Sequence, residues 1–329
     1  MPLDAPIYLI QREKMKPDIT SAPLILSRKI RGMFWPVFGL FLMGLSPNHY
    51  PQTEVNTKLL ITPKTLKNIP LEKRIIIDAR SKFKFLMGHI PGAINLNDWR
   101  EFTSKKNEIK GLLIEDKILV ANKLAKAGIN PQISIVIYSD PENPWRTDGR
   151  FFWMFERYGF ANVAILDGGF DVWKNSGGAI ESGFQKVPKP SMITQKDINL
   201  NSEVIADKLL INSILSDNNY ILIDNRTQKE YHGAIPYGSP RGGHIPNAIH
   251  IHWPDFFNKD GTLKSKPDLS SLMQKAGIQP HQEIIVYCTG GVRSAMAYFV
   301  FRYLGFKVRN YDGSWWDWSH DPNLPIEIS

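Results

Sequence analysis

Two stretches of this 329-residue chain repeat one another without a gap. KAGINPQISIVIYSD (126–140) aligns with KAGIQPHQEIIVYCT (275–289) at a constant offset of 149 residues. Two flanking pairs extend the match, RIIIDARSKFKFLMGHIPGAINL (74–96) with YILIDNRTQKEYHG and RGGHIPNAIHI (220–251), and ERYGFANVAILDGGFDVW (156–173) with FRYLGFKVRNYDGSWWDW (301–318). Self-similarity of this length indicates two copies of one supersecondary unit. The fold must therefore accommodate the same unit twice.

Each copy alternates short β-rich runs with helical patterns, such as EDKILVANKLAKAGI in the first and DLSSLMQKAGI in the second. This alternation is typical of an α/β fold in which a parallel sheet carries helices on both faces. The proline, lysine and serine content of residues 183–195 marks a linker. We therefore expect two doubly wound domains, the first copy at 55–182 and the second copy at 196–329.

Residues 1–54 are expected to form a separate N-terminal segment. Basic residues at positions 28–31 precede the apolar run MFWPVFGLFLMGL (33–45), which is shorter than the roughly 20 residues that span a bilayer. A basic flank before a short apolar core resembles an export signal, with Gly44 and Ser46 as a small-x-small site. One interpretation is an exported or periplasmic protein. The other is a membrane-associated or loosely folded segment on a cytoplasmic protein, and membrane contact is expected only through this segment if it is uncleaved.

Composition limits the chemistry. The chain contains one cysteine, Cys288, which excludes an internal disulfide framework and any cysteine-rich zinc site. We accordingly expect no metal. The formal charge of +8 and the isoelectric point of about 9.3 favour anionic small molecules. Because the basic residues are spread widely and no dense basic run is interleaved with aromatics, nucleic-acid binding is not predicted.

Cys288 lies between a strand pattern and a helix pattern. Residues 284–287 are β-branched or aromatic, Gly290 and Gly291 follow the cysteine, and apolar positions at helical spacing begin at Ala295. In a strand–loop–helix unit, loop amides and the first helical turn point N–H groups toward the sulfur. Such surroundings lower a thiol pKa from about 8.5 to roughly 3.5–7.5. A lone cysteine is more often a small buried hydrophobe, but this context favours a nucleophile.

The length of the loop narrows the chemistry further. Four residues separate Cys288 from Arg293, which adds a full positive charge, and Ser294 follows. The resulting C-x4-R-S pattern is one residue shorter than the C-x5-R loop of cysteine phosphatases. A shorter ring of amides suits a single sulfur atom carried on the cysteine better than a tetrahedral phosphate.

This loop and three further motifs resemble the rhodanese family. FLMGHIPGAINL (85–96) fits the family's H-[IL]-P-G-A pattern, and VRNYDGSWWDW (308–318) fits its C-terminal pattern. D-x-R triplets recur at 78–80 and 224–226, after the expected strands. The chain is thus identified as a member of the tandem-domain rhodanese family, which comprises thiosulfate and 3-mercaptopyruvate sulfurtransferases, over nearly everything after residue 55.

The resemblance implies that only the second copy is catalytic. There Cys288 would carry a persulfide held by the amides of the loop, which consists of Thr289, Gly290, Gly291, Val292, Arg293 and Ser294. In the first copy Ser139 takes the place of the cysteine, and its loop is three residues longer and carries three carboxylates. A serine without a nearby base is inert, and carboxylates repel an anionic donor. The first copy is therefore expected to be a structural partner and part of the cleft wall.

The resemblance also implies the reaction. The thiolate attacks the outer sulfur of a donor, and cyanide or a thiol then removes that sulfur, with ping-pong kinetics. Both known subfamilies place an arginine where this chain has Glu230, and their loops read C-R-K-G-V-T or C-G-S-G-V-T rather than C-T-G-G-V-R. Arg293 and Arg241 are the candidates to replace that anchor for an anionic donor. We favour thiosulfate over 3-mercaptopyruvate.

The acceptor stays open between cyanide, glutathione, thioredoxin and a sulfur carrier protein, and no cofactor is expected. Near the site, Asp224 and Arg226 of the second D-x-R triplet are expected to be structural. His244 and His89, in the two G-H-I-P turns, are expected to hydrogen-bond the backbone rather than move protons.

Two rival functions remain at this level. One is a binding module in which both copies are inactive and the anionic pocket docks a partner or a sulfur carrier. The other is a phosphatase or arsenate reductase of a related fold, which would require C-x5-R. The intact C-x4-R loop disfavours both.

Overall fold

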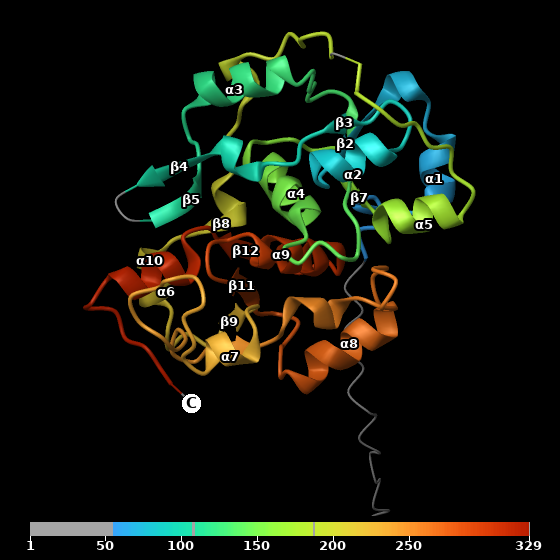
Figure 1. Cartoon of the computed structure of the whole chain (residues 1–329). Helices are drawn as coiled ribbons and strands as arrows, with labels where there is room; N and C mark the ends of the chain where they lie inside the picture. The colour runs from blue at the N-terminus through green and yellow to red at the C-terminus, as the bar shows by residue number, and fades with distance from the viewer. Residues whose placement is uncertain (1–54, 107–108, 187, 329) are drawn as a thin grey trace, which may run out of the picture. The chain divides into compact units, whose positions relative to one another are not determined.

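The computed structural model describes residues 55–106, 109–186 and 188–328 (Figure 1). The proposed export signal at 33–45 lies outside the described residues. Within the described part of the chain, no helix has the length and apolar character needed to cross a membrane.

Each copy contains a five-stranded, wholly parallel sheet, and the two sheets have the same strand order. The first runs β1 (Leu60–Ile61), β7 (Val163–Leu166), β6 (Ser134–Tyr138), β2 (Arg74–Asp78) and β3 (Ile94–Asn95). The second runs β8 (Ile205–Ala206), β12 (Val308–Tyr311), β11 (Glu283–Tyr287), β9 (Tyr220–Asp224) and β10 (Ile249–His250). The equal topologies confirm the α/β class that the internal repeat predicts.

The helices alternate with these strands. The first copy contains α1 (Pro63–Asn68), α2 (Lys82–Met87), α3 (Lys117–Lys126), α4 (Thr147–Arg157) and α5 (Gly169–Asn175). The second contains α6 (Lys208–Ser213), α7 (Gln228–Tyr231), α8 (Lys266–Lys275), α9 (Arg293–Tyr303) and α10 (Ser314–His320). Single 3-10 turns lie at Leu71–Lys73, Trp99–Phe102, Gln195–Asp197, Ser202–Val204 and Trp253–Phe256. An antiparallel hairpin of β4 (Thr103–Lys106) and β5 (Ile109–Leu113) extends the first copy.

The strands are apolar on both faces because helices cover both faces. In β6, Ile135 and Ile137 belong to one buried cluster, whereas Val136 and Tyr138 belong to another on the opposite side of the sheet. This alternation follows from the two-residue period of a strand. Burial of each large apolar side chain contributes roughly 1.5–3 kcal/mol to the stability of the fold. Because helices cover both faces of the sheet, apolar residues at successive positions of β6 all gain this stabilisation.

A single core cluster joins the two copies through α4 and α9, which pack against each other. Residues 151–155 of α4 and 295–301 of α9 are all buried, so each helix is enclosed on every side over these turns. Both helices lie in the middle of the molecule (Figure 1). The apolar turns are typical of such a central position, whereas the first turn of α4 buries the charged residues Asp148 and Arg150. At the margin of the contact, Glu156 of α4 pairs with Arg302 of α9 at 3.0 Å.

The two helices approach most closely at Gly149. A methyl group on this residue would lie 2.5 Å from the Cα atom and 2.8 Å from the backbone nitrogen of Met296. Atoms cannot approach so closely without movement of the backbone, so glycine is needed here for the helices to touch.

We expect Gly149→Ala to lower the free energy of unfolding by about 1–3 kcal/mol, the usual effect of overpacking a core. In a solvent-exposed helix the same substitution would raise the free energy of unfolding by up to ~1 kcal/mol. A decrease would therefore show that the added methyl group is crowded by Met296. Urea unfolding measures the difference. Gly177→Ala is the comparison, since nothing lies within 4 Å of its added methyl group but its φ of +69° is strained for alanine. Its loss of about 1–2 kcal/mol measures backbone strain without crowding. An unchanged or raised stability for Gly149→Ala would show that the helices can separate freely.

Candidate active site

Cys288 lies in the loop between β11 and α9, as the strand–loop–helix pattern predicts. Its backbone N–H donates to Ser314 Oγ at 3.2 Å, and its carbonyl accepts from the Trp315 N–H at 3.0 Å. The Trp316 N–H donates to the Thr289 carbonyl at 2.9 Å. The first turn of α10 therefore holds the beginning of the loop in place.

The Cys288 side chain is buried, with 1% of its surface exposed. Burial is the largest influence on its pKa and raises it, but the charge of Arg293 and the N–H groups of Ser294 and Gly290 lower it. The Ser294 hydroxyl, 3.5 Å from Sγ, adds to this effect. The net result is a pKa below the ordinary thiol value. The surroundings thus favour the thiolate despite the absence of bulk water.

Asn310, on β12, is a site residue that the sequence analysis missed. Its Oδ1 accepts from the Ser294 hydroxyl at 2.7 Å, and its Nδ2 donates to the Gly291 carbonyl at 3.2 Å. Because the Ser294 hydroxyl has one hydrogen, it can donate either to Asn310 or to the Cys288 sulfur. The available signal was an asparagine in a short strand, Val308–Tyr311, that pairs with the buried strand β11.

Glu230 and Arg293 form a buried ion pair next to Cys288. Arg293 donates through both terminal nitrogens to the two carboxylate oxygens, each at 2.8 Å, and the Thr289 hydroxyl donates to Oε1 at 2.8 Å. Thr227, the N-cap of α7, completes a capping box with Glu230. Burial is the largest influence and raises the Glu230 pKa, but the Arg293 hydrogen bonds and charge and the two threonine hydroxyls lower it to about 2.

The pair changes the expected role of Arg293. From the sequence, Arg293 was a candidate to replace the anchor that is lost at position 230. The structure shows that Glu230 itself occupies the guanidinium, so Arg293 is not a free cation for an anionic donor. The sequence showed that position 230 has glutamate instead of the arginine of related enzymes. It did not show that this glutamate pairs with Arg293.

The guanidinium of Arg241 is engaged by the protein itself. It donates to backbone carbonyls in and after α10, those of Trp318, Ser319, Asp321 and Leu324. It therefore ties down the C-terminal segment, and a role in binding the donor stays a prediction.

The D-x-R triplets form buried ion pairs at the ends of β2 and β9. Asp224 pairs with Arg226 at 2.6 Å, and Arg226 also donates to the Gly243 carbonyl at 2.7 Å, directly before His244. His244 hydrogen-bonds the Tyr231 carbonyl through Nδ1 at 3.0 Å and stacks on its ring at 3.7 Å. These contacts fix the chain beside the loop.

Two aromatic side chains, Trp145 and Tyr237, pack against the guanidinium of Arg293. Each ring centroid lies 5.5 Å from the guanidinium carbon, and the rings meet edge to face at 5.4 Å. Trp145 comes from the longer loop of the first copy, so a side chain of that copy contacts a residue next to the reactive cysteine loop. The only feature of the sequence that pointed to Trp145 was the extra length of the loop after Ser139.

Ser139, the counterpart of Cys288, has no proton acceptor suited to activate it among its hydrogen-bond partners. Its hydroxyl accepts from the Asn143 amide at 2.9 Å, and an amide cannot act as a general base. The neighbouring Asp140 pairs with Lys84 at 2.9 Å. Among the described residues, no group of three or more His, Cys, Asp or Glu is placed to hold a metal ion.

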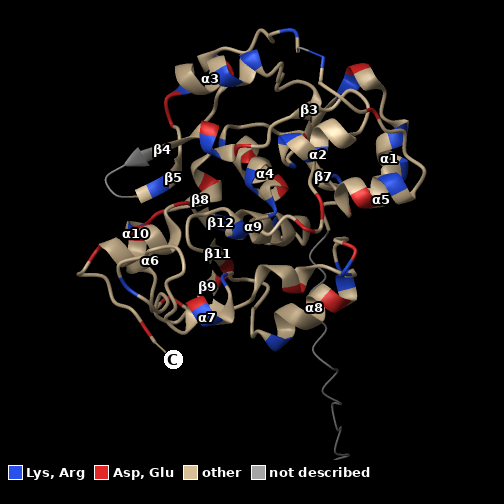
Figure 2. Cartoon of the chain, viewed as in Figure 1, with Lys and Arg blue, Asp and Glu red and all other residues tan. Residues whose placement is uncertain are grey.

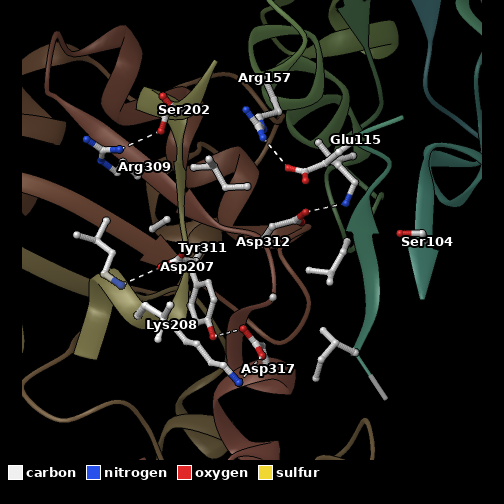
Figure 3. A pocket seen from close by; sticks show the side chains of 18 residues that line it. Ser104, Glu115, Arg157, Ser202, Asp207, Lys208, Arg309, Tyr311, Asp312 and Asp317 are labelled. Atoms are coloured by element: carbon white, nitrogen blue, oxygen red, sulfur yellow. Dashed lines mark hydrogen bonds and ion pairs between the residues drawn. The ribbon is translucent and has the colours of Figure 1, made fainter. Parts of the chain in front are cut away.

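A cleft of about 740 Å³ opens between the two copies, but its lining does not include Cys288 or residues 289–294. Figure 3 shows that its charged side chains face one another, and Arg157 pairs with Glu115 at 2.6 Å. Asp312 and Gly313 form part of its wall. Basic and acidic residues are likewise interspersed over both copies (Figure 2). This cleft adjoins the reactive loop without exposing the sulfur.

Comparisons with known proteins agree with this arrangement. The family model described as "Rhodanese-like domain" matches residues 62–176 and 209–321. A protein of Corynebacterium glutamicum named "Thiosulfate sulfurtransferase" is 31% identical over 253 residues, 73% of this chain and 80% of the relative. "Sulfur carrier protein TtuD" of Thermus thermophilus is 31% identical over 250 residues, 73% of this chain and 85% of the relative. The crystal structure of YnjE is 25% identical with a TM-score of 0.72, covering 83% of this chain and 68% of that one.

The ion pair at Glu230 predicts a specific acid sensitivity. The folded pKa of about 2 lies below the ordinary 4.5, so the pair contributes stability above about pH 4.5 that is lost as the pH falls toward 2. The shift corresponds to a contribution on the order of 3 kcal/mol. Urea unfolding should show that wild type and Glu230→Gln differ most near neutral pH and converge in acid. The exposed Glu101→Gln is the control, and a difference that is independent of pH would contradict the assignment.

Proposed function

The chain belongs to the rhodanese-like domain family, and from this premise we propose that it is a sulfurtransferase that carries sulfur on Cys288. One observation carries the proposal. A buried thiol with a lowered pKa lies where the N–H groups of Gly290 and Ser294 are directed at its sulfur. Such a position can hold a thiolate or, after reaction, the terminal sulfur of a persulfide.

The reaction needs no external oxidant. The Cys288 thiolate attacks the outer sulfur of thiosulfate and forms a new S–S bond, while the old S–S bond breaks and its electron pair leaves with sulfite. A second nucleophile then attacks the outer sulfur of the persulfide, and the electron pair of that S–S bond returns to Cys288. In both steps the loop N–H groups stabilise negative charge on sulfur without reorganisation. Ping-pong kinetics follow from the covalent intermediate.

Thiosulfate is the donor that we propose first and 3-mercaptopyruvate the second. The name of the C. glutamicum relative supports this order. For the acceptor we propose cyanide or a thiol, and the name of the T. thermophilus relative supports a sulfur carrier protein among the thiols. The alternative is a binding module that docks such a partner without turnover.

Intact-mass spectrometry after brief incubation with each donor tests the proposal. We expect a gain of one sulfur atom, its loss on addition of cyanide, and no gain in Cys288→Ala. Ser139→Ala is the control and should load like wild type, since its hydroxyl contacts only an amide of its own loop and the wall of the first copy. If folded wild-type protein with a free thiol gains no sulfur from either donor, the binding module becomes the better explanation.

The Glu230–Arg293 pair leads to a prediction about the donor. In Glu230→Gln the side chain keeps its size but loses its charge, so the positive charge of Arg293 is no longer neutralised and attracts the thiosulfate anion. We set this attraction at about 1.4 kcal/mol or more. We expect the KM for thiosulfate to fall about tenfold or more. The variant should also be less stable than wild type without the anion, because breaking a buried pair leaves an unpaired charge, and thiosulfate should restore part of the loss.

Steady-state kinetics and thermal unfolding with and without thiosulfate measure both effects. Glu283→Gln is the matched control, since Glu283 is also buried and paired, with Lys307 at 2.7 Å, but lies at the opposite end of β11 from Cys288. An equal or higher KM in Glu230→Gln would mean that the carboxylate does not limit donor binding.

A further inference from the structure

Two side chains from outside the loop hold the Gly291 carbonyl. Arg150 donates to it through NH1 at 3.0 Å, and Asn310 donates through Nδ2 at 3.2 Å. Asn310 lies in the second copy, but Arg150 lies on α4 of the first. The copy that lacks a nucleophile therefore contacts the backbone of the loop that contains one.

The guanidinium of Arg150 is itself held through both terminal nitrogens, whereas its Nε has no hydrogen-bond partner. NH1 also donates to Asp312 Oδ1 at 2.7 Å, and NH2 donates to the Gly111 carbonyl at 2.7 Å. The other carboxylate oxygen of Asp312, a residue labelled in Figure 3, accepts from the Leu113 N–H at 2.8 Å. Arg150 is 1% exposed, and the Trp99 and Trp153 rings lie 5.3 and 4.8 Å from its guanidinium carbon. Its position is set by the fold rather than by the loop.

The direction of the Gly291 carbonyl matters because a peptide group is planar and trans. When this carbonyl points toward Arg150, the N–H of Val292 in the same plane points to the opposite side. Gly291 has a φ of +72°, and a methyl group there would lie 2.6 Å from the Asp312 carbonyl oxygen. Glycine is required at this position, yet glycine also allows the peptide to rotate most easily. Something else must hold the orientation.

We propose that Arg150 is a positioning residue that holds the Gly291 peptide so that the loop presents N–H groups, not a carbonyl, to the Cys288 sulfur. The role of this sulfur rests on the proposed function, but its acidity does not. Without Arg150 only Asn310 Nδ2, at 3.2 Å, still holds the Gly291 carbonyl. The peptide can then rotate more easily and turn the negative end of its dipole toward the loop interior. The thiolate becomes less stable, and so does the charge on a bound terminal sulfur.

The contact is not reciprocal between the copies. Because Gly159 aligns with Gly305, the residue of α9 that corresponds to Arg150 is Met296. Methionine has no donor with which to hold a carbonyl in the loop of the first copy. The first copy thus has Arg150 but no cysteine, and the second copy has Cys288 but no such arginine. Each copy supplies one part of a single site.

The test measures the acidity of Cys288 directly. As this is the only cysteine in the chain, the ultraviolet absorbance of the thiolate against pH, with Cys288→Ser subtracted, reports on this sulfur alone. We compare wild type with Arg150→Met, which removes the charge, and Arg150→Lys, which keeps it but lacks the planar fork that reaches three acceptors. Arg146→Met is the matched control, because Arg146 is equally buried beside α4 and pairs with Asp148 at 2.9 Å.

The expected result is an apparent thiol pKa about one unit higher in Arg150→Met and a clear part of that rise in Arg150→Lys, with no change in Arg146→Met. The rate of sulfur loading should fall about tenfold in Arg150→Met, in line with the smaller thiolate fraction. Wild-type acidity in Arg150→Lys would show that charge alone suffices and would overturn the proposal, as would wild-type acidity in both variants.

Two further readouts keep the result interpretable. Thermal unfolding identifies a variant that does not fold, and if Arg150→Met fails, Arg150→Lys decides the question. The titration uses no sulfur donor. If wild type takes up no sulfur, the proposed function fails, while the effect of Arg150 on the thiol can still be observed.

Discussion

The close packing of α4 against α9 is the constraint on which the rest of the structure depends. Both helices are buried on every side, and their separation is set by the contact between Gly149 and Met296. That separation places Arg150 and Trp145 of the first copy against the loop that begins at Cys288. If the helices were moved apart by one methyl group, the sheets could still form, but the contacts that complete the site would be displaced.

The electrostatics of the site differ from a simple cationic pocket. The net charge of +8 indicated attraction of anions by the molecule as a whole. At the site, however, Glu230 neutralises Arg293, and the aromatic rings cover what remains of the guanidinium. The charge of Arg293, which Glu230 partly offsets, and the oriented backbone N–H groups of Ser294 and Gly290 together stabilise charge on the sulfur. Dipoles fixed in this way act over a short range, so they favour the charged atom of the enzyme more than a distant anionic group of a donor.

The sequence predicted the features that depend on local pattern. The repeat and the alternation of strands and helices were sufficient for two parallel sheets, and the glycine pair after a buried strand was sufficient to single out Cys288. The partners of that loop could not be predicted, because they lie far away in the sequence. Arg150 and Gly291 are 141 positions apart, and no periodicity relates them. The bonds of Arg241 to carbonyls in and after α10 could not be predicted for a related reason, since nearness in sequence to the His244 turn does not tell where a long side chain ends.

The duplication looks modular in sequence, but the site is not modular in structure. The second copy contains the cysteine, the loop and the ion pair, and it could be mistaken for a complete catalytic unit. The bond from Arg150 to Gly291 has no counterpart in the other direction, because Met296 stands at the equivalent position. Ring contacts cross both ways, with Trp145 on Arg293 and Phe257 on Arg146. Divergence after duplication has therefore turned two equal units into an obligate pair. A new cysteine at Ser139 would not give a second site, because its loop would still lack a partner arginine at Met296.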